Sequence, residues 1–189
     1  MGMDTIKLRK MTLTVVGVAA LWWLTFHFND WIAAAVQVND HVNWLFLPAA
    51  LRVLAVLMFG AAGVLGLFLG SVAVDVLRGA PLNWLLVLVP AALSSLAPAL
   101  AAWMIRRWYG IPLILSGLTQ AHLFRVVVLS ALVNGLSQQA WWVLSGVQAP
   151  SLLTLAAMVV GDVLGGLVVM YALSLLIDWV EYLMDRRSL

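Results

Sequence analysis

Apolar residues follow one another in six long runs, and polar residues gather in the short stretches between them. A helix that crosses a membrane needs about 20 mostly apolar residues, so the runs predict six crossing helices. Their expected bounds are 11–29, 43–59, 61–77, 84–104, 120–141 and 151–180. Only Gly60 separates the second run from the third, and we expect a turn there. The pattern therefore predicts one all-α membrane domain over residues 1–189, a polytopic helix bundle.

The composition identifies lipid as the solvent of these runs. Of the 189 residues, 65% are hydrophobic and 10% are charged, and the mean hydropathy is +1.06. Soluble domains are about 25% charged, and a soluble domain of this size could not bury so much apolar surface. Because no small-residue cleavage site follows the first run, we expect that run to remain as a helix. The chain is therefore expected to be a multi-pass membrane protein.

The basic residues predict the orientation of the chain. With the N-terminus in the cytoplasm, only Arg78 falls outside and Arg52 falls within the membrane. The other basic residues then lie on the cytoplasmic side: Lys7, Arg9, Lys10, Arg106, Arg107, Arg125, Arg186 and Arg187. Since Lys and Arg favour that side, we expect both termini to be cytoplasmic. The net charge of +2 reflects this topology, and no nucleic-acid partner is expected.

The residues that carry chemistry argue against an enzyme and against a cofactor. Because the chain has no cysteine, thiolate metal sites and cysteine nucleophiles are excluded. His27 and His122 fall at opposite ends of their helices, so they cannot share a haem. Neither a nucleophile with a positioned base nor a metal-binding set can be identified. We therefore expect no catalytic residue, no metal and no cofactor.

Two ionisable residues are expected deep in the membrane, where each costs about 2.5–3.5 kcal/mol on insertion scales. Arg52 lies about 13 Å along its helix from Asn43, at 1.5 Å per residue. Asp162 has a compatible depth, so an Arg52–Asp162 ion pair is our first expectation, and an anion on the guanidinium is the alternative. Asn134 and Gln138 lie four residues apart and could line an outward cavity or bond neighbouring helices. Arg52, Asp162, Asn134 and Gln138 are the candidate ligand-binding residues.

Other patterns predict how the helices pack. Asp75 and Arg78 share a helical face, where a local pair is expected. Two groups of small residues predict close helix contacts: Gly60, Gly63, Gly66 and Gly70, and Gly161, Gly165 and Gly166. The tryptophans fall near helix ends and predict an aromatic belt: Trp22, Trp23, Trp31, Trp44, Trp84, Trp103, Trp108, Trp141, Trp142 and Trp179.

The second and fourth runs share a short sequence echo. NWLFLPAAL at 43–51 matches Asn83-Trp84 and, after an insertion, VPAAL at 89–93. In this alignment Ser94 takes the position of Arg52. Duplicated helix groups often place binding sites at the repeat interface, although short apolar strings also match by chance.

Several of these motifs resemble MASE1, a bacterial integral membrane sensory domain. NWLFLPAAL at 43–51, the Phe59–Gly60 turn and GLFLG at 66–70 resemble its opening half. Residues 120–138 are similar to a later helix, and GDVLGG at 161–166 is similar to its closing motif. The resemblance covers about two thirds of the chain. It implies a sensory module in a bacterial inner (cytoplasmic) membrane.

The chain also departs from that family. MASE1 usually has more spans than the six predicted here, and its motif is uncharged at the position of Arg52. It usually precedes a cytoplasmic output domain, such as a histidine kinase or a cyclic-di-GMP enzyme. Only residues 181–189 follow the last run, so we expect a stand-alone module that signals through a separate partner.

Three functions fit these observations. The first is a stand-alone MASE1-like module that senses a small ligand, expected to be anionic, or that recruits a partner protein. The second is a small-solute or ion transporter, because buried Arg and Asp residues are common on substrate paths. The third is an accessory subunit of a larger membrane complex. The expected partners are the lipid bilayer and a membrane protein or a second copy of this chain.

Overall fold

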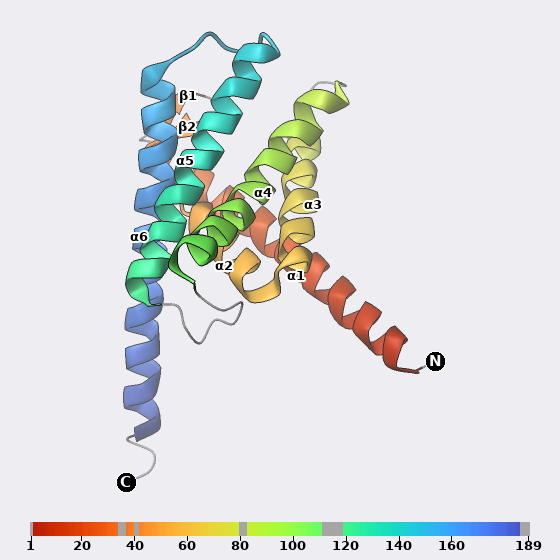
Figure 1. The fold of residues 1–189 in the computed structure, drawn as a ribbon, viewed down its shortest axis with the longest axis vertical. Helices are drawn as coiled ribbons and strands as arrows, with labels where there is room; N and C mark the ends of the chain where they lie inside the picture. The colour runs from red at the N-terminus through yellow and green to blue at the C-terminus, as the bar shows by residue number, and fades with distance from the viewer. Residues whose placement is uncertain (1, 34–36, 40–41, 80–82, 111–118, 186–189) are drawn as a thin grey trace.

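The structure, a computed structural model, describes residues 2–33, 37–39, 42–79, 83–110 and 119–185. Helices make up nearly all of this part of the chain (Figure 1): α1 (Gly2–Ala33), α2 (Pro48–Phe59), α3 (Ala61–Leu77), α4 (Trp84–Tyr109), α5 (Gln120–Leu144) and α6 (Leu152–Asp185). A short antiparallel hairpin of β1 (Gln37–Asn39) and β2 (Val42–Asn43) follows α1, with Gln37 opposite Asn43. The predicted helical architecture is therefore confirmed.

Four of these helices, α1, α4, α5 and α6, are long and apolar enough to cross a membrane. They indicate a multi-pass membrane protein. The other two are shorter: α2 has 12 residues and α3 has 17. At 1.5 Å per residue α2 extends about 18 Å, well short of the ~30 Å hydrocarbon core of a bilayer. The second and third predicted spans thus correspond to α2 and α3, which together form a short helical hairpin.

The predicted start of the second span at residue 43 is wrong, because α2 begins at Pro48. Proline suits the first turn of a helix, and the backbone before it bonds elsewhere. The Phe46 amide donates to the Gly161 carbonyl at 3.0 Å, and the Leu47 amide donates to Asn29 Oδ1 at 2.8 Å. At membrane depth, non-helical backbone is tolerated only where protein or a cavity surrounds it.

The short helix α2 lies at the centre of the bundle, in contact with each of the other five helices. It joins two apolar clusters. Val53 and Leu57 pack against α4 and α5, whereas Ala55 and Val56 pack against α1 and α3. Arg52 therefore projects from the helix that holds the two halves of the bundle together.

Most of the predicted glycine contacts are present, but Gly60 makes none, because a Cβ atom built there would meet nothing within 4 Å. A Cβ atom built on Gly66 would approach the Val18 side chain to 2.7 Å, and one on Gly70 would approach Trp22 to 2.9 Å, so both glycines let α3 lie close to α1. Gly166 likewise faces Val127 of α5. Gly60 forms the expected turn between α2 and α3 with a positive φ of 54°, a conformation that glycine adopts readily.

The predicted aromatic belt needs one correction. Several tryptophans are exposed on the helices, as lipid-facing residues should be: Trp31, Trp84, Trp103, Trp108 and Trp179. Trp22 is instead buried, with 3% of its surface exposed. Its indole packs against the Phe26 and Phe46 rings, at centroid distances of 6.0 and 6.2 Å. Trp22 therefore belongs to the core and not to the belt.

Candidate functional site

A buried ion pair joins α2 to α6. Arg52 Nη2 donates to Asp162 Oδ1 at 2.6 Å, and only 3% and 8% of the two side chains are exposed. Asn134 Nδ2 of α5 donates to the second carboxylate oxygen at 2.9 Å. The predicted Arg52–Asp162 pair is confirmed, and Asn134 lies beside it as expected. Both oxygens of the carboxylate thus have a donor, as a buried charge requires.

Aromatic rings and a hydroxyl surround the rest of the guanidinium. Arg52 Nη1 donates to Ser94 Oγ of α4 at 3.2 Å. The Arg52 Cζ atom lies 5.7 Å from the centre of the Trp22 ring and 5.0 Å from that of Phe46, within the range of cation–π attraction. The sequence did not predict these three partners. Its one relevant signal was the echo that aligns Arg52 with Ser94, since the two aligned positions are in contact.

All six helices contribute to a cavity of about 750 Å³ that contains this cluster. We call it the outer cavity, because the sequence predicts that this end of the bundle faces outward. The four candidate residues all line it, as do the partners of Arg52. Asp30, Asp75 and Arg78 line it near the end of α3. Arg78, which the sequence placed with Asp75, forms an ion pair with Asp30 of α1 and lies 4.5 Å above the Phe26 ring. The volume falls within the range of about 300–1,000 Å³ typical of small-molecule sites.

Gln138 reaches the outer cavity from α5, one turn from Asn134. Its Nε2 donates to the Pro90 carbonyl of α4 at 2.9 Å. The bond between Gln138 and Pro90 therefore ties α5 to α4, the second helix of the sequence echo.

Five buried polar atoms of the residues that line this cavity have no hydrogen-bond partner within the described chain. Three are donors and two are acceptors: Trp22 Nε1, Arg52 Nε, Trp141 Nε1, Asn134 Oδ1 and Gln138 Oε1. A buried polar group without a partner costs about 1–3 kcal/mol. Both kinds of group gather around one space, so the cavity can satisfy a ligand that both donates and accepts hydrogen bonds.

The charges around the cavity bear on the kind of ligand. Its described lining holds three aspartates and two arginines, a formal charge of −1: Asp30, Asp75, Asp162, Arg52 and Arg78. Each arginine already pairs with an aspartate. The formal charge of the described lining is therefore less favourable to an anion than to a neutral or cationic molecule. The expected anionic ligand stays a prediction, and the lining favours a neutral or cationic polar molecule.

Aromatic rings make up much of the remaining lining and add to that preference. They come from three segments of the chain: Trp22, Phe26, Phe46, Trp141 and Trp142. Aromatic faces attract cations and pack against apolar parts of a ligand. In the described part of the chain, no three His, Asp or Glu side chains gather closely enough to hold a metal ion.

No protein-family model, curated protein or solved structure gives a significant match to this chain. The likeness to MASE1 therefore depends on the motifs in the sequence and stays a prediction.

Proposed function

We propose that this chain is a MASE1-like sensory module of a bacterial inner membrane, which binds a small polar solute in the outer cavity. The observation that carries the proposal is the set of five buried polar atoms without partners around that cavity. The proposed solute is neutral or cationic and carries both donor and acceptor groups. A partner protein in the membrane receives the signal.

We propose six crossings, and the arrangement of the helices supports an even number of crossings with both termini in the cytoplasm. The start of α1 and the end of α6 lie toward the same end of the molecule (Figure 1). The end of α3, the start of α4 and the junction between α5 and α6 lie toward the opposite end. That end carries few basic residues, in agreement with the positive-inside rule.

A ligand in the outer cavity is well placed to change the packing of the bundle. The lining atoms belong to all six helices, and the ion pair couples α2 to α6. A solute that bonds to Asn134 or Arg52 would either replace one of their hydrogen bonds to Asp162 or add a further bond to them. A ligand shifts a conformational equilibrium by its difference in affinity between the two states. The proposed signal is such a shift in how α2 packs against α6.

Transport is the second candidate, and two observations favour it. The short helix α2 begins inside the bundle, and broken or unusually short helices mark the binding sites of many transporters. The two aligned positions of the sequence echo, Arg52 and Ser94, bond to each other at the cavity. An accessory subunit, the third candidate, needs no ligand and gives no role to the five polar atoms.

The outer cavity can be probed with cysteine substitutions, because the chain has no cysteine of its own. Ser94→Cys places a thiol in the cavity. Ser95→Cys is the matched control, since Ser95 is buried on the other side of α4 and its hydroxyl donates to the Ala91 carbonyl at 2.8 Å. Each variant is treated from outside with a cationic ethylammonium and an anionic ethylsulfonate methanethiosulfonate reagent, and the rate of labelling is measured.

We expect Ser94→Cys to react faster than Ser95→Cys, and to react faster with the cationic reagent, because the lining carries excess negative charge. Equal and slow labelling of both variants would contradict a solute cavity. Faster reaction with the anionic reagent would instead favour the anionic ligand that the sequence predicts. Flux of a solute found to bind, measured in reconstituted vesicles, then separates transport from sensing.

A further inference from the structure

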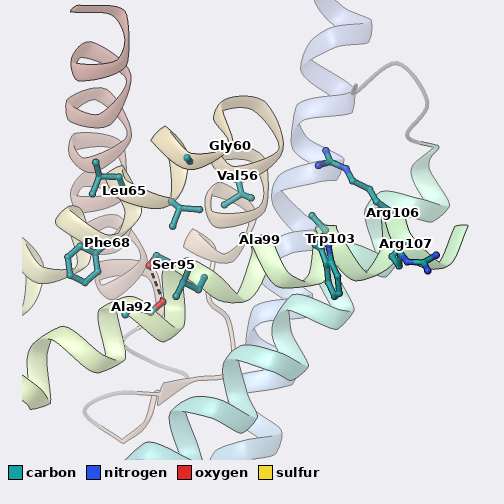
Figure 2. Close-up of a pocket in the computed structure, with 14 residues that line it drawn as sticks. Val56, Gly60, Leu65, Phe68, Ala92, Ser95, Ala99, Trp103, Arg106 and Arg107 are labelled. Carbon is teal, nitrogen blue, oxygen red and sulfur yellow. Dashed lines mark hydrogen bonds between the residues drawn. The ribbon is translucent and has the colours of Figure 1, made fainter. Parts of the chain in front are cut away.

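A second concavity lies between the start of α3 and the second half of α4, and we call it the inner groove. Its volume is about 800 Å³. Figure 2 shows Phe68 and Ala92 toward one end of the groove, and Trp103, Arg106 and Arg107 toward the other. The end of α2 and the Gly60 turn lie between them. None of the four candidate residues of the outer cavity lines this groove.

The long part of the inner groove suits hydrocarbon. Ala, Val, Leu and Phe residues form most of its described lining, and Ser95 is the one uncharged polar side chain there. The Ser95 hydroxyl is already bonded to the Ala91 carbonyl within α4. This stretch therefore offers a ligand no unpaired neutral polar group, in contrast to the outer cavity, and a polar occupant would lose its bonds to water.

The far end of the inner groove suits an anionic head group. Arg106 and Arg107 line it, and the described lining contains no acidic residue. The guanidinium group binds phosphate through two parallel hydrogen bonds. Trp103 beside them is 63% exposed, and tryptophan favours the interface between lipid and water. Positive charge and an interfacial ring thus occur at the end where the apolar stretch stops.

The length of the inner groove matches one leaflet of a bilayer. Ala92 and Arg106 are 14 residues apart on α4, which corresponds to about 21 Å of helix at 1.5 Å per residue. One leaflet contributes about 15 Å, half of a hydrocarbon core of about 30 Å. A chain that starts at the arginines can therefore run through the leaflet without leaving the groove.

We propose that the inner groove binds one anionic phospholipid of the cytoplasmic leaflet. An acyl chain lies along α3 and α4, and the phosphate is held by Arg106 and Arg107. The size of the groove, its apolar lining and its charge at one end all fit this occupant. The inference concerns a different surface from the outer cavity and holds whether or not that cavity binds a solute.

The test compares phosphatidylglycerol, which is anionic, with phosphatidylcholine, which is zwitterionic, on the full chain after lipid removal. Bound lipids are counted by native mass spectrometry during titration with each lipid. We expect one phosphatidylglycerol to bind at least tenfold more tightly than phosphatidylcholine, a difference of about 1.4 kcal/mol. Equal binding of the two lipids would overturn the proposal, and this comparison needs no variant.

Two variants locate the site. Arg106→Gln with Arg107→Gln should remove the preference for phosphatidylglycerol, whereas Arg125→Gln, an exposed arginine outside the groove, should keep it. Ala61→Trp, at an exposed position that lines the groove, should reduce binding of both lipids by filling the apolar stretch. Unchanged lipid binding in both groove variants would overturn the proposal. So would a change in cross-linked oligomers with Ala61→Trp and no change in lipid binding, because the groove would then be a protein interface.

Discussion

The guanidinium of Arg52 contacts side chains from three other helices, so its removal should weaken the packing of all of them. Asp162 is the most important partner, and each charge depends on the other for its pairing inside the membrane. Breaking a buried pair from one side costs about 3–5 kcal/mol, because an uncompensated charge remains. We therefore expect Arg52→Ala and Asp162→Ala each to lower thermal stability in detergent strongly. The double variant should lose less stability than the sum of the two.

Arg125→Ala is the matched control for this cycle. Arg125 also lies over an aromatic ring, 4.5 Å from the centre of Tyr109, but its side chain is exposed on α5. An exposed contact of this type contributes about 0.5–1 kcal/mol, so the control should change little. If both single variants of the ion pair were as stable as this control, the pair would not be structural, and Arg52 would be held mainly for a ligand.

At the residue scale, the sequence predicted the ion pair but not its surroundings. Two opposite charges at similar depth in lipid have few partners other than each other, so depth alone brought Arg52 and Asp162 together. Depth says nothing about the rotation of a helix around its axis. Trp22 therefore could not be distinguished from an interfacial tryptophan, and the contact between Arg52 and Ser94 could not be identified from two separate runs.

At the scale of elements, the apolar runs located the four long helices but not all of their bounds, since α1 begins at Gly2 and not at residue 11, and they placed the start of α2 too early. The backbone at Phe46 and Leu47 is fixed by Gly161 and Asn29, which are distant in sequence. A local pattern cannot reveal such bonds. The segment NWLFL is apolar whether or not it is helical. The apolar run alone therefore predicts a helix from residue 43, five residues before α2 begins.

The contact between α6 and the segment before α2, at Phe46 and Leu47, depends on Gly165. A Cβ atom built there would overlap the Phe46 carbonyl and would lie 2.7 Å from the Leu47 amide nitrogen, and backbone atoms cannot move aside easily. We expect Gly165→Ala to displace the segment from α6, to weaken the Phe46–Gly161 hydrogen bond and to lower the midpoint of thermal unfolding by several degrees.

Gly17→Ala is the matched control for Gly165→Ala. Gly17 also lies inside a helix, but a Cβ atom there would meet nothing within 4 Å. Replacement of an unconstrained helical glycine by alanine is favourable by about 0.5–1 kcal/mol. The control should therefore be neutral or stabilising. A Gly165→Ala variant that behaved in the same way would show that the segment does not depend on its close approach to α6.

At the scale of the whole molecule, the orientation of the long helices does not depend on the hairpin of α2 and α3. The hairpin begins inside the bundle and reverses direction at Gly60, so it adds either two crossings or none. The basic residues support the same placement of both termini in either case. The charge pattern therefore could predict the orientation, but it could not test whether the short helices complete a crossing.

The inner groove gives the best indication of how far the hairpin reaches. Gly60, at the turn of the hairpin, lines the same groove as Trp103, Arg106 and Arg107 near the end of α4. Figure 2 shows the turn between the level of Ala92 and that of the arginines, where α4 is expected to leave the membrane on the cytoplasmic side. On this basis we expect the hairpin to cross the membrane, although α2 is short.

Single cysteines in this cysteine-free chain can test that expectation. Ala149→Cys marks the junction of α5 and α6, Tyr109→Cys marks the end of α4, and Phe59→Cys marks the turn of the hairpin; all three side chains are exposed. A membrane-impermeant maleimide applied to intact cells should label only Ala149→Cys. Inverted membrane vesicles should expose Tyr109→Cys and Phe59→Cys together, because both are expected to face the cytoplasm. If Phe59→Cys resisted labelling from both sides while Tyr109→Cys reacted in the vesicles, the hairpin would end inside the bilayer. The chain would then cross the membrane four times, with both termini still in the cytoplasm.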